Sequence, residues 1–172
     1  MTSTLTLAAL SGMDQPAFVA ALDGIYEHSS WVAAGAWAAR PFATLPALAA
    51  ALEAVMWAAE PVQQRALICA HPELAGRAAM AGGLTAASSS EQQGAGLLHC
   101  TAAELARLQA LNADYRQRFG FPFVVAVRGL SRQDIIDQLA ARLQATPEHE
   151  YRTALEQIAR IAGWRLADRM AG

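Results

Sequence analysis

The side chain best suited to move a proton at neutral pH lies in the segment His71-Pro72-Glu73-Leu74-Ala75-Gly76. Histidine changes charge closer to neutral pH than any other unperturbed side chain. Pro72 cannot continue a helical hydrogen-bond ladder and disfavours the α conformation at the residue before it, so His71 is expected at a forced break after an apolar helical run. His71 is therefore a candidate acid/base. The structural alternative is a histidine that only interacts with the last carbonyls of a helix.

A second candidate segment is the polar run Ser88-Ser89-Ser90-Glu91-Gln92. It follows a loop predicted over residues 76–85, whose clearest signal is a pair of adjacent glycines. Ser88 and Glu91 have the three-residue spacing of a capping box, which predicts that Ser88 opens a new helix. Free backbone N–H groups and hydroxyls at such a helix start can bind an anion. Ordinary capping chemistry is the alternative explanation.

A third candidate segment, residues 119–127, gathers β-branched and aromatic residues in the sequence FGFPFVVAV. Such a run could form a short buried strand, but the chain holds no second comparable run to pair with it. We therefore predict an extended, buried connector. Its backbone N–H and C=O groups must then bond helix ends, side chains or a ligand, because buried backbone groups are rarely left unpaired.

One cation of the last predicted helix is a candidate partner for a buried anion. The apolar face of that helix runs from Leu155 to Leu166, and Arg165 lies on its flank whereas Arg160 projects to the opposite side. Guanidinium groups suit contacts with carboxylates, which makes Arg165 the better candidate of the two. The alternative is an arginine whose stem packs on the core while its charge reaches water.

The elements that must position these residues are predicted to be helices almost throughout, because cap residues and apolar stripes recur along the chain. A first helix is expected from Asp14 to about residues 27–30. The starts of further helices are predicted near Trp31, Thr44, Pro61, Ser88, Thr101, Ser131 and Thr146. The predicted fold is all-α, a single-domain irregular helical bundle of about eight helices.

Composition excludes several classes of protein. The 172 residues, 54% of them hydrophobic, suffice for one domain with a sizeable core. A formal net charge of −2 gives no basic footprint for nucleic acid, and no cluster of Lys or Arg suggests a membrane surface. Charged residues interrupt each alanine-rich window before it could span a bilayer. The start of the chain lacks the positive charge of a signal peptide, so a cytoplasmic location is expected.

The cysteines and histidines give no sign of a metal site. Cys69 and Cys100 are too few for a disulfide framework, and both are expected to be reduced and buried. The histidines at 28, 71, 99 and 149 lack an HExxH-like spacing, so no metal is expected and a metal-dependent hydrolase is disfavoured.

Taken together, the segments resemble those of one family. In chain order, the motifs that carry the resemblance are Tyr26-Glu27-His28-Ser29-Ser30-Trp31-Val32, Arg40-Pro41-Phe42, His71-Pro72-Glu73-Leu74-Ala75-Gly76, Leu84-Thr85 with Ser88 to Gln92, Leu111-Asn112-Ala113-Asp114-Tyr115, Phe119-Gly120-Phe121-Pro122-Phe123, Arg142-Leu143 and Arg165-Leu166. Their order and spacing resemble 2-oxo-4-hydroxy-4-carboxy-5-ureidoimidazoline (OHCU) decarboxylase, an enzyme of urate breakdown. The resemblance runs from about Phe18 to Arg165, and HPELAG and FGFPF are its most specific motifs.

The resemblance implies a fold, an activity and a set of site residues. It implies a single all-α domain over residues 1–172, a homodimer, and decarboxylation of OHCU to S-allantoin and CO2. By resemblance His71 and Glu91 are catalytic. The residues implied to contact the substrate are Pro72, Ser88, Ser89, Ser90, Glu91, Gln92, Phe123, Val124, Val125, Ala126, Val127 and Arg165.

The implied chemistry agrees with the residue types. In OHCU the departing carboxylate sits on a carbon that adjoins a ring C=N, so the electron pair left by CO2 can flow into that bond. No cofactor is therefore expected, and the protein has to supply orientation, charge stabilisation and a proton. His71 can serve as the acid/base, either at the hydroxyl or in the return of the proton, while Glu91 and Gln92 can hold the ureido and ring amides. The alternative is a non-catalytic helical binding module associated with purine-catabolic enzymes.

Overall fold

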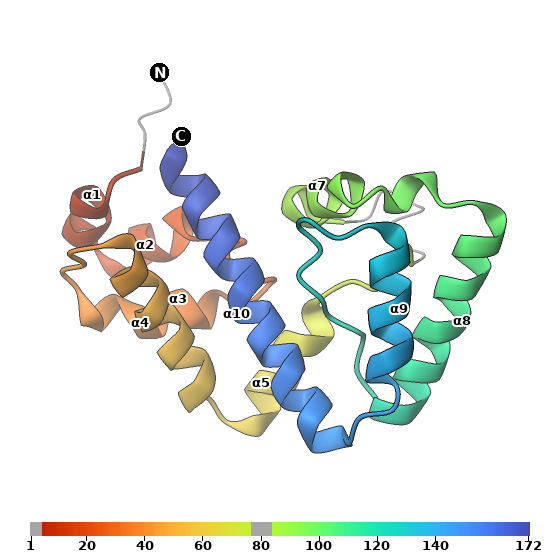
Figure 1. Cartoon of the computed structure of the whole chain (residues 1–172). Coiled ribbons are helices and arrows are strands. Elements are labelled where there is room, and N and C mark those ends of the chain that lie inside the picture. The colour runs from red at the N-terminus through yellow and green to blue at the C-terminus, as the bar shows by residue number, and fades with distance from the viewer. Residues whose placement is uncertain (1–4, 77–83) are drawn as a thin grey trace. The chain divides into compact units, whose positions relative to one another are not determined.

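A computed structural model describes residues 5–76 and 84–172, and within these ranges the chain is helical without any strand (Figure 1). The described residues form nine α-helices and two short 3-10 helices, so the predicted all-α class is confirmed and the predicted number of about eight helices is close. Most of the loop predicted over residues 76–85 lies outside the described residues.

The chain divides into two compact units. Unit 1 comprises Met1–Leu67 and Ala159–Gly172, and unit 2 comprises Ile68–Ile158. Two helices, α5 (Pro61–Ala70) and α10 (Pro147–Ala171), contribute residues to both units. The single domain over residues 1–172 stays a prediction.

Unit 1 is built on packed helices around a core of aliphatic and aromatic side chains. The bounds of its remaining elements are α1 Leu7–Gly12, α2 Gln15–Ala21, α3 Ser30–Ala36, η1 Trp37–Ala39 and α4 Leu45–Ala58. Helix α3 packs against both α2 and α4. Thr44 caps α4 as predicted, because its hydroxyl accepts a hydrogen bond from the Ala47 N–H at 3.2 Å.

The first predicted helix is shorter than expected. The sequence predicts that this helix, α2 in the structure, extends to residues 27–30. It ends at Ala21, and an irregular loop follows. Gly24 and His28 in this loop have positive φ angles of 80° and 47°, which a right-handed helix cannot accommodate. Leu22 and Ile25 are still buried, at 3% and 2% exposure. The apolar spacing therefore reflects burial of the loop and not helical continuity.

Two helices of unit 2, α8 and α9, begin at the caps that the sequence predicts. The elements that complete it are α7 Ala86–Gly94, η2 Leu97–His99, α8 Ala102–Phe119 and α9 Arg132–Arg142, with α9 packed against α8. Capping boxes at both Thr101 with Glu104 and Ser131 with Asp134 are present, which confirms the two predictions. The left-handed Gly120, at φ 75°, ends α8.

The predicted cap at Ser88 is wrong. Thr85 is the N-cap of α7, and its hydroxyl accepts a hydrogen bond from the Ser88 N–H at 3.2 Å. Ser88 is thus the third residue of the helix, and Glu91 lies six positions beyond the cap, too far along the helix to complete a box. Thr85 is a favourable N-cap residue and the two alanines after it are good helix formers, so the helix begins about one turn before the predicted start.

The predicted buried connector is confirmed from Phe121 on, whereas Phe119 is the last residue of α8 and Gly120 is its C-cap. Residues 121–127 are all buried and have neither helix nor strand conformation, and Figure 1 shows them in the uncoiled ribbon that joins α8 to α9. The ring of Tyr115 on α8 contacts the rings of Phe121 and Phe123, with centroid distances of 6.0 and 5.4 Å. The aromatic residues therefore bury the connector against α8.

The prediction for the cysteines is wrong in part. Both are free, but Cys69 is exposed and Cys100 is half-buried. Leu67 and Ile68 fill the buried side of α5, which leaves Cys69 on the outer side of the same helix.

No single helix within the described ranges is long and apolar enough to cross a bilayer, and only α4 and α5 taken together, bent by 117°, satisfy the length and composition required.

Candidate functional site

His71 occupies the helix break that the sequence predicts. It follows α5 directly, its backbone N–H donates to the Ile68 carbonyl at 3.2 Å, and only 7% of the residue is exposed. Pro72 comes next and is half-buried. A buried histidine at a rigid corner has few rotamers available, as an acid/base with a fixed direction requires.

Two buried amide side chains hold the segment that follows His71. Gln92 Oε1, on α7, accepts the Ala75 N–H at 3.0 Å, and Asn112 Nδ2, on α8, donates to the Leu74 carbonyl at 3.0 Å. Both amides are almost fully buried, at 3% and 4% exposure. Ala75 has a φ of 51°, a left-handed conformation that costs a residue with a Cβ free energy. The two amides keep the backbone in this unfavourable state.

Two contacts restrict the end of the segment: an ion pair of Glu73 with Arg116, and the close packing of Gly76 against Glu73. Glu73 Oε1 lies 2.7 Å from Arg116 Nε in a partly exposed ion pair with α8. A Cβ added at Gly76 would lie 3.0 Å from the Cβ of Glu73 and 3.3 Å from its carbonyl oxygen. A side chain at Gly76 would therefore crowd Glu73, and glycine avoids this contact.

Helix α7 presents its predicted site residues unequally. Ser88 and Gln92, one turn apart on the same face, are buried at 4% and 3% exposure. Ser89 and Glu91 are half-buried, and Ser90 is exposed. The structure thus joins the predicted segments at 71–76 and 88–92 through the Gln92–Ala75 hydrogen bond.

A buried charge network surrounds the connector. Arg142, on α9, donates from Nη1 to the Val124 carbonyl at 2.7 Å and from Nε to both oxygens of Glu150 at 3.1 and 3.0 Å. Glu150 is fully buried and also accepts a hydrogen bond from the Tyr115 hydroxyl. Burial raises the pKa of the Tyr115 phenol, and its hydrogen bond to Glu150 raises that pKa further, so it stays protonated and donates.

The sequence motifs predict no role for the side chains of Arg142, Glu150 and Tyr115. The Gln157 side chain also contacts the connector, since its Oε1 accepts the Ala126 N–H at 2.9 Å. Glu150 could have been found, because it precedes Ala154 by one turn and so falls on the apolar face of α10. A carboxylate on an apolar face requires a buried partner.

Arg165 lies in unit 1 and is buried, at 7% exposure. Its Nη1 donates to Glu27 Oε2 at 2.6 Å and to the Gly24 carbonyl at 3.0 Å. Its charge is therefore paired inside the unit and does not reach water along the surface. Glu27, at 2% exposure, is the anion that the structure places beside it.

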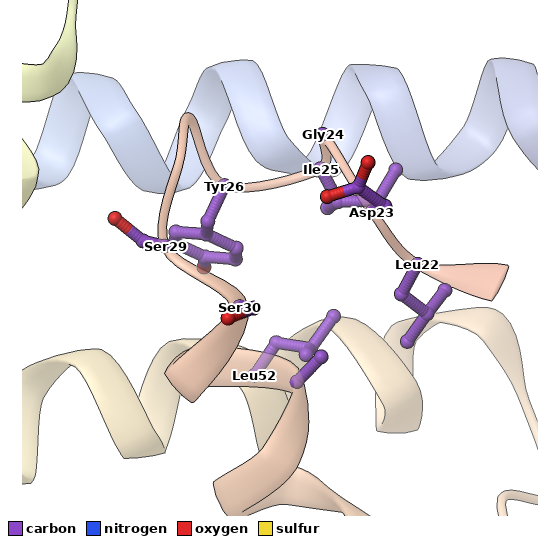
Figure 2. Close-up of a pocket in the computed structure, with 9 residues that line it drawn as sticks. Leu22, Asp23, Gly24, Ile25, Tyr26, Ser29, Ser30 and Leu52 are labelled. Atoms are coloured by element: carbon purple, nitrogen blue, oxygen red, sulfur yellow. The ribbon is translucent and has the colours of Figure 1, made fainter. Parts of the chain in front are cut away.

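A small pocket also lies in unit 1, with room for little more than one water molecule. Figure 2 shows that most of its lining comes from the loop between α2 and α3, including Tyr26 and Ser29, with Leu52 contributed by α4. None of the predicted site residues lines it.

The described ranges contain no group of three His, Cys, Asp or Glu side chains arranged to hold a metal ion.

Comparison with known proteins gives a consistent result. A family model described as OHCU decarboxylase matches residues 11–167. The decarboxylase of that name from Mus musculus is 41% identical over 164 residues, covering 95% of this chain and 92% of the relative. The one from Haloferax volcanii is 38% identical and covers 97% of both chains.

Solved structures agree with these relatives. A crystal structure of (S)-allantoin synthase superposes with a TM-score of 0.75 at 34% identity, covering 96% of this chain and 54% of that one. A crystal structure of OHCU decarboxylase in the presence of (S)-allantoin has a TM-score of 0.71 at 20% identity, covering 86% and 96%, and shows the likeness of fold.

Proposed function

The chain belongs to the OHCU decarboxylase family, and we propose that it acts through His71 as the acid/base that delivers a proton to one face of the substrate. The reaction is the decarboxylation of OHCU to allantoin in the degradation of urate. The observation that carries the proposal for His71 is its buried position at the rigid break after α5, in a segment held by both α7 and α8.

The substrate itself supplies the route for the electrons. The C–C bond to the carboxylate breaks, CO2 leaves, and the electron pair moves into the adjoining ring C=N. This leaves a C=C bond between the hydroxyl-bearing and the ureido-bearing carbons. The ureido-bearing carbon then takes up a proton while the hydroxyl loses its proton and becomes the carbonyl, and delivery to a single face gives S-allantoin. A positioned acid/base contributes on the order of a hundred- to ten-thousand-fold to such a step. The reaction needs no cofactor as an electron sink.

Helix α7 supplies the groups proposed to hold the ureido and ring amides. Glu91 is proposed to be catalytic together with His71, and Ser88, Ser89, Ser90 and Gln92 to contact the substrate. Half-burial of Glu91 and Ser89 is compatible with contact to a small molecule. Gln92 has a second task, since its Oε1 already accepts the Ala75 N–H. Pro72 is proposed to line the site beside His71.

The connector is proposed to contact the substrate ring through its backbone, over Phe123, Val124, Val125, Ala126 and Val127. Among the described residues, no group hydrogen-bonds the N–H or C=O of Phe123 or of Val125, although these residues are only 2% and 4% exposed. Buried backbone groups seldom stay unpaired. A cyclic amide, which carries one donor and one acceptor side by side, complements such groups.

Arg165 is proposed to meet a carboxylate of the substrate. Its support is the chemistry of the guanidinium and its burial, which strengthens a contact with an anion. Glu27 would hold the guanidinium in place through the 2.6 Å contact of Nη1.

The homodimer and the cytoplasmic location belong to the same proposal. Among the described residues, Trp57 and Val62 are large apolar side chains with 37% and 74% exposure, and both lie where α4 meets α5. Exposed apolar residues close together favour a protein contact. Light scattering that shows a strictly monomeric mass at working concentration would exclude the dimer.

The experiment that tests the function uses purified protein treated with a chelator and given freshly generated product of urate oxidation. Loss of substrate with formation of optically active allantoin is expected. Racemic allantoin at the rate of the spontaneous reaction would instead favour the non-catalytic binding module, and activity that disappears on chelation would favour a metal-dependent enzyme.

A further inference from the structure

Two side chains hold one edge of the connector. In an extended backbone the N–H and C=O of one residue point to one side and those of the next residue to the other. Val124 and Ala126 therefore share an edge, and it is this edge that receives the Arg142 Nη1 at 2.7 Å and the Gln157 Oε1 at 2.9 Å. By the same alternation, the backbone groups of residues 123 and 125 face the opposite edge, where no described residue is hydrogen-bonded to them.

Of the two contacts to the held edge, the one from Arg142 is itself held by a buried carboxylate. Glu150 is fully buried and accepts from both the Arg142 Nε and the Tyr115 hydroxyl. The guanidinium of Arg142 also lies over the ring of Phe123, 4.4 Å from its centroid. A charged hydrogen bond and a cation–π contact thus act on adjacent residues of the same segment.

We infer that Arg142 and Gln157 are positioning residues, which fix the Val124–Ala126 edge so that the Phe123 and Val125 backbone groups face the substrate ring. This inference rests on the proposed function. It assigns the two side chains an effect on substrate placement without any contact of their own with the substrate. Misplacement of a binding group by about 1 Å can cost on the order of a hundredfold in rate.

Gln157 offers the cleanest variants because it is neutral and half-buried. Gln157→Leu removes the acceptor for the Ala126 N–H, whereas Gln157→Glu keeps an oxygen at the same reach. Gln133→Leu is the matched control, since Gln133 is exposed on α9 and bonds only Asp137 among the described side chains. Arg142→Lys tests the contact of Arg142 with the Val124 carbonyl. Lysine keeps a positive charge beside Glu150 but lacks the planar guanidinium that bonds Glu150 and Val124 together.

The readouts are amide hydrogen exchange at Ala126 and its neighbours, together with kcat and KM for OHCU. In Gln157→Leu we expect exchange at Ala126 to become at least about tenfold faster and kcat/KM to fall about ten- to a hundredfold. Gln157→Glu and Gln133→Leu should stay within about twofold of wild type in both. Arg142→Lys should resemble Gln157→Leu, with faster exchange in the connector and a lower kcat/KM.

Three results would overturn the inference. Unchanged exchange in Gln157→Leu would show that Gln157 does not hold the connector. Faster exchange with unchanged kcat/KM, in a preparation whose wild type is active, would show that the edge does not place the substrate while the proposed function stands. A wild-type protein without activity on OHCU would remove the proposed function and the positioning role together, and the exchange data would then report only on local structure.

Discussion

Unit 2 holds two segments proposed to face the substrate, and it holds them by different means. The segment from His71 to Gly76 is held mainly by neutral amides, Gln92 and Asn112, which bond its backbone. The connector is held by an ion pair between Arg142, whose side chain is 14% exposed, and the fully buried Glu150, and by the Tyr115 phenol. Both devices fix backbone groups rather than side chains.

The difference has energetic consequences. A neutral hydrogen bond contributes about 1 kcal/mol net, and removing one partner leaves a buried group unsatisfied at about 1–3 kcal/mol. Removal of one member of a buried ion pair costs more, about 3–5 kcal/mol, because the remaining charge is stranded. Loss of the ion pair at the connector should therefore unfold the protein. Loss of an amide at the His71 segment should change the position of that segment while the protein stays folded.

The largest effect on stability is expected at the ion pair. Arg142→Leu leaves the Glu150 carboxylate buried without its cation and should lower the free energy of unfolding by about 3–5 kcal/mol in urea titration. Arg152→Leu is the control, because Arg152 forms an exposed ion pair with Glu156 on the same helix and should change stability by about 1 kcal/mol or less. Similar losses in both variants would contradict the role of burial.

A smaller effect is expected at the amide that holds Ala75. Gln92→Leu removes the acceptor for a buried N–H and should cost about 1–3 kcal/mol of unfolding free energy while lowering activity. Gln92→Glu keeps an oxygen acceptor and should keep most of the stability. If Gln92→Glu is stable but inactive, the amide contacts the substrate as well as the backbone. If both variants retain full activity, neither task of Gln92 matters to catalysis.

The smallest change in stability is expected at Glu91. No capping box involves this residue, since the cap of α7 is Thr85, so Glu91→Gln should keep the melting temperature within a few degrees. Its turnover should fall about a hundredfold if the charge takes part in catalysis. Normal kinetics in this variant would assign Glu91 a structural role.

Local signals in the sequence predicted the fold well. Thr44, Thr101 and Ser131 are confirmed caps because a cap depends on residues only three positions away. The helix end at Ala21 was missed because the positive φ values of Gly24 and His28 depend on packing of the loop and not on nearby residues.

The candidate site was predictable only in part. The break at His71 follows from Pro72, and the buried connector follows from its composition. The network around Glu150 joins residues 35 positions apart, Tyr115 and Glu150, and no spacing in the sequence announces such a contact. The resemblance to the family indicated which segments contact the substrate. The hydrogen bonds that hold each segment are visible only in the structure.

The central claim is that His71 delivers the proton, and the His71→Ala variant tests it most directly. His71 is buried, so its truncation leaves a cavity, and the variant should lose about 0.5–3 kcal/mol of stability and remain folded with a lower melting temperature than the wild type. The rate of OHCU loss and the optical rotation of the allantoin should be measured on the same preparation. We expect the enzymatic rate to fall about a hundred- to ten-thousand-fold and the allantoin to become racemic. S-allantoin formed at near wild-type rate by His71→Ala would contradict the mechanism.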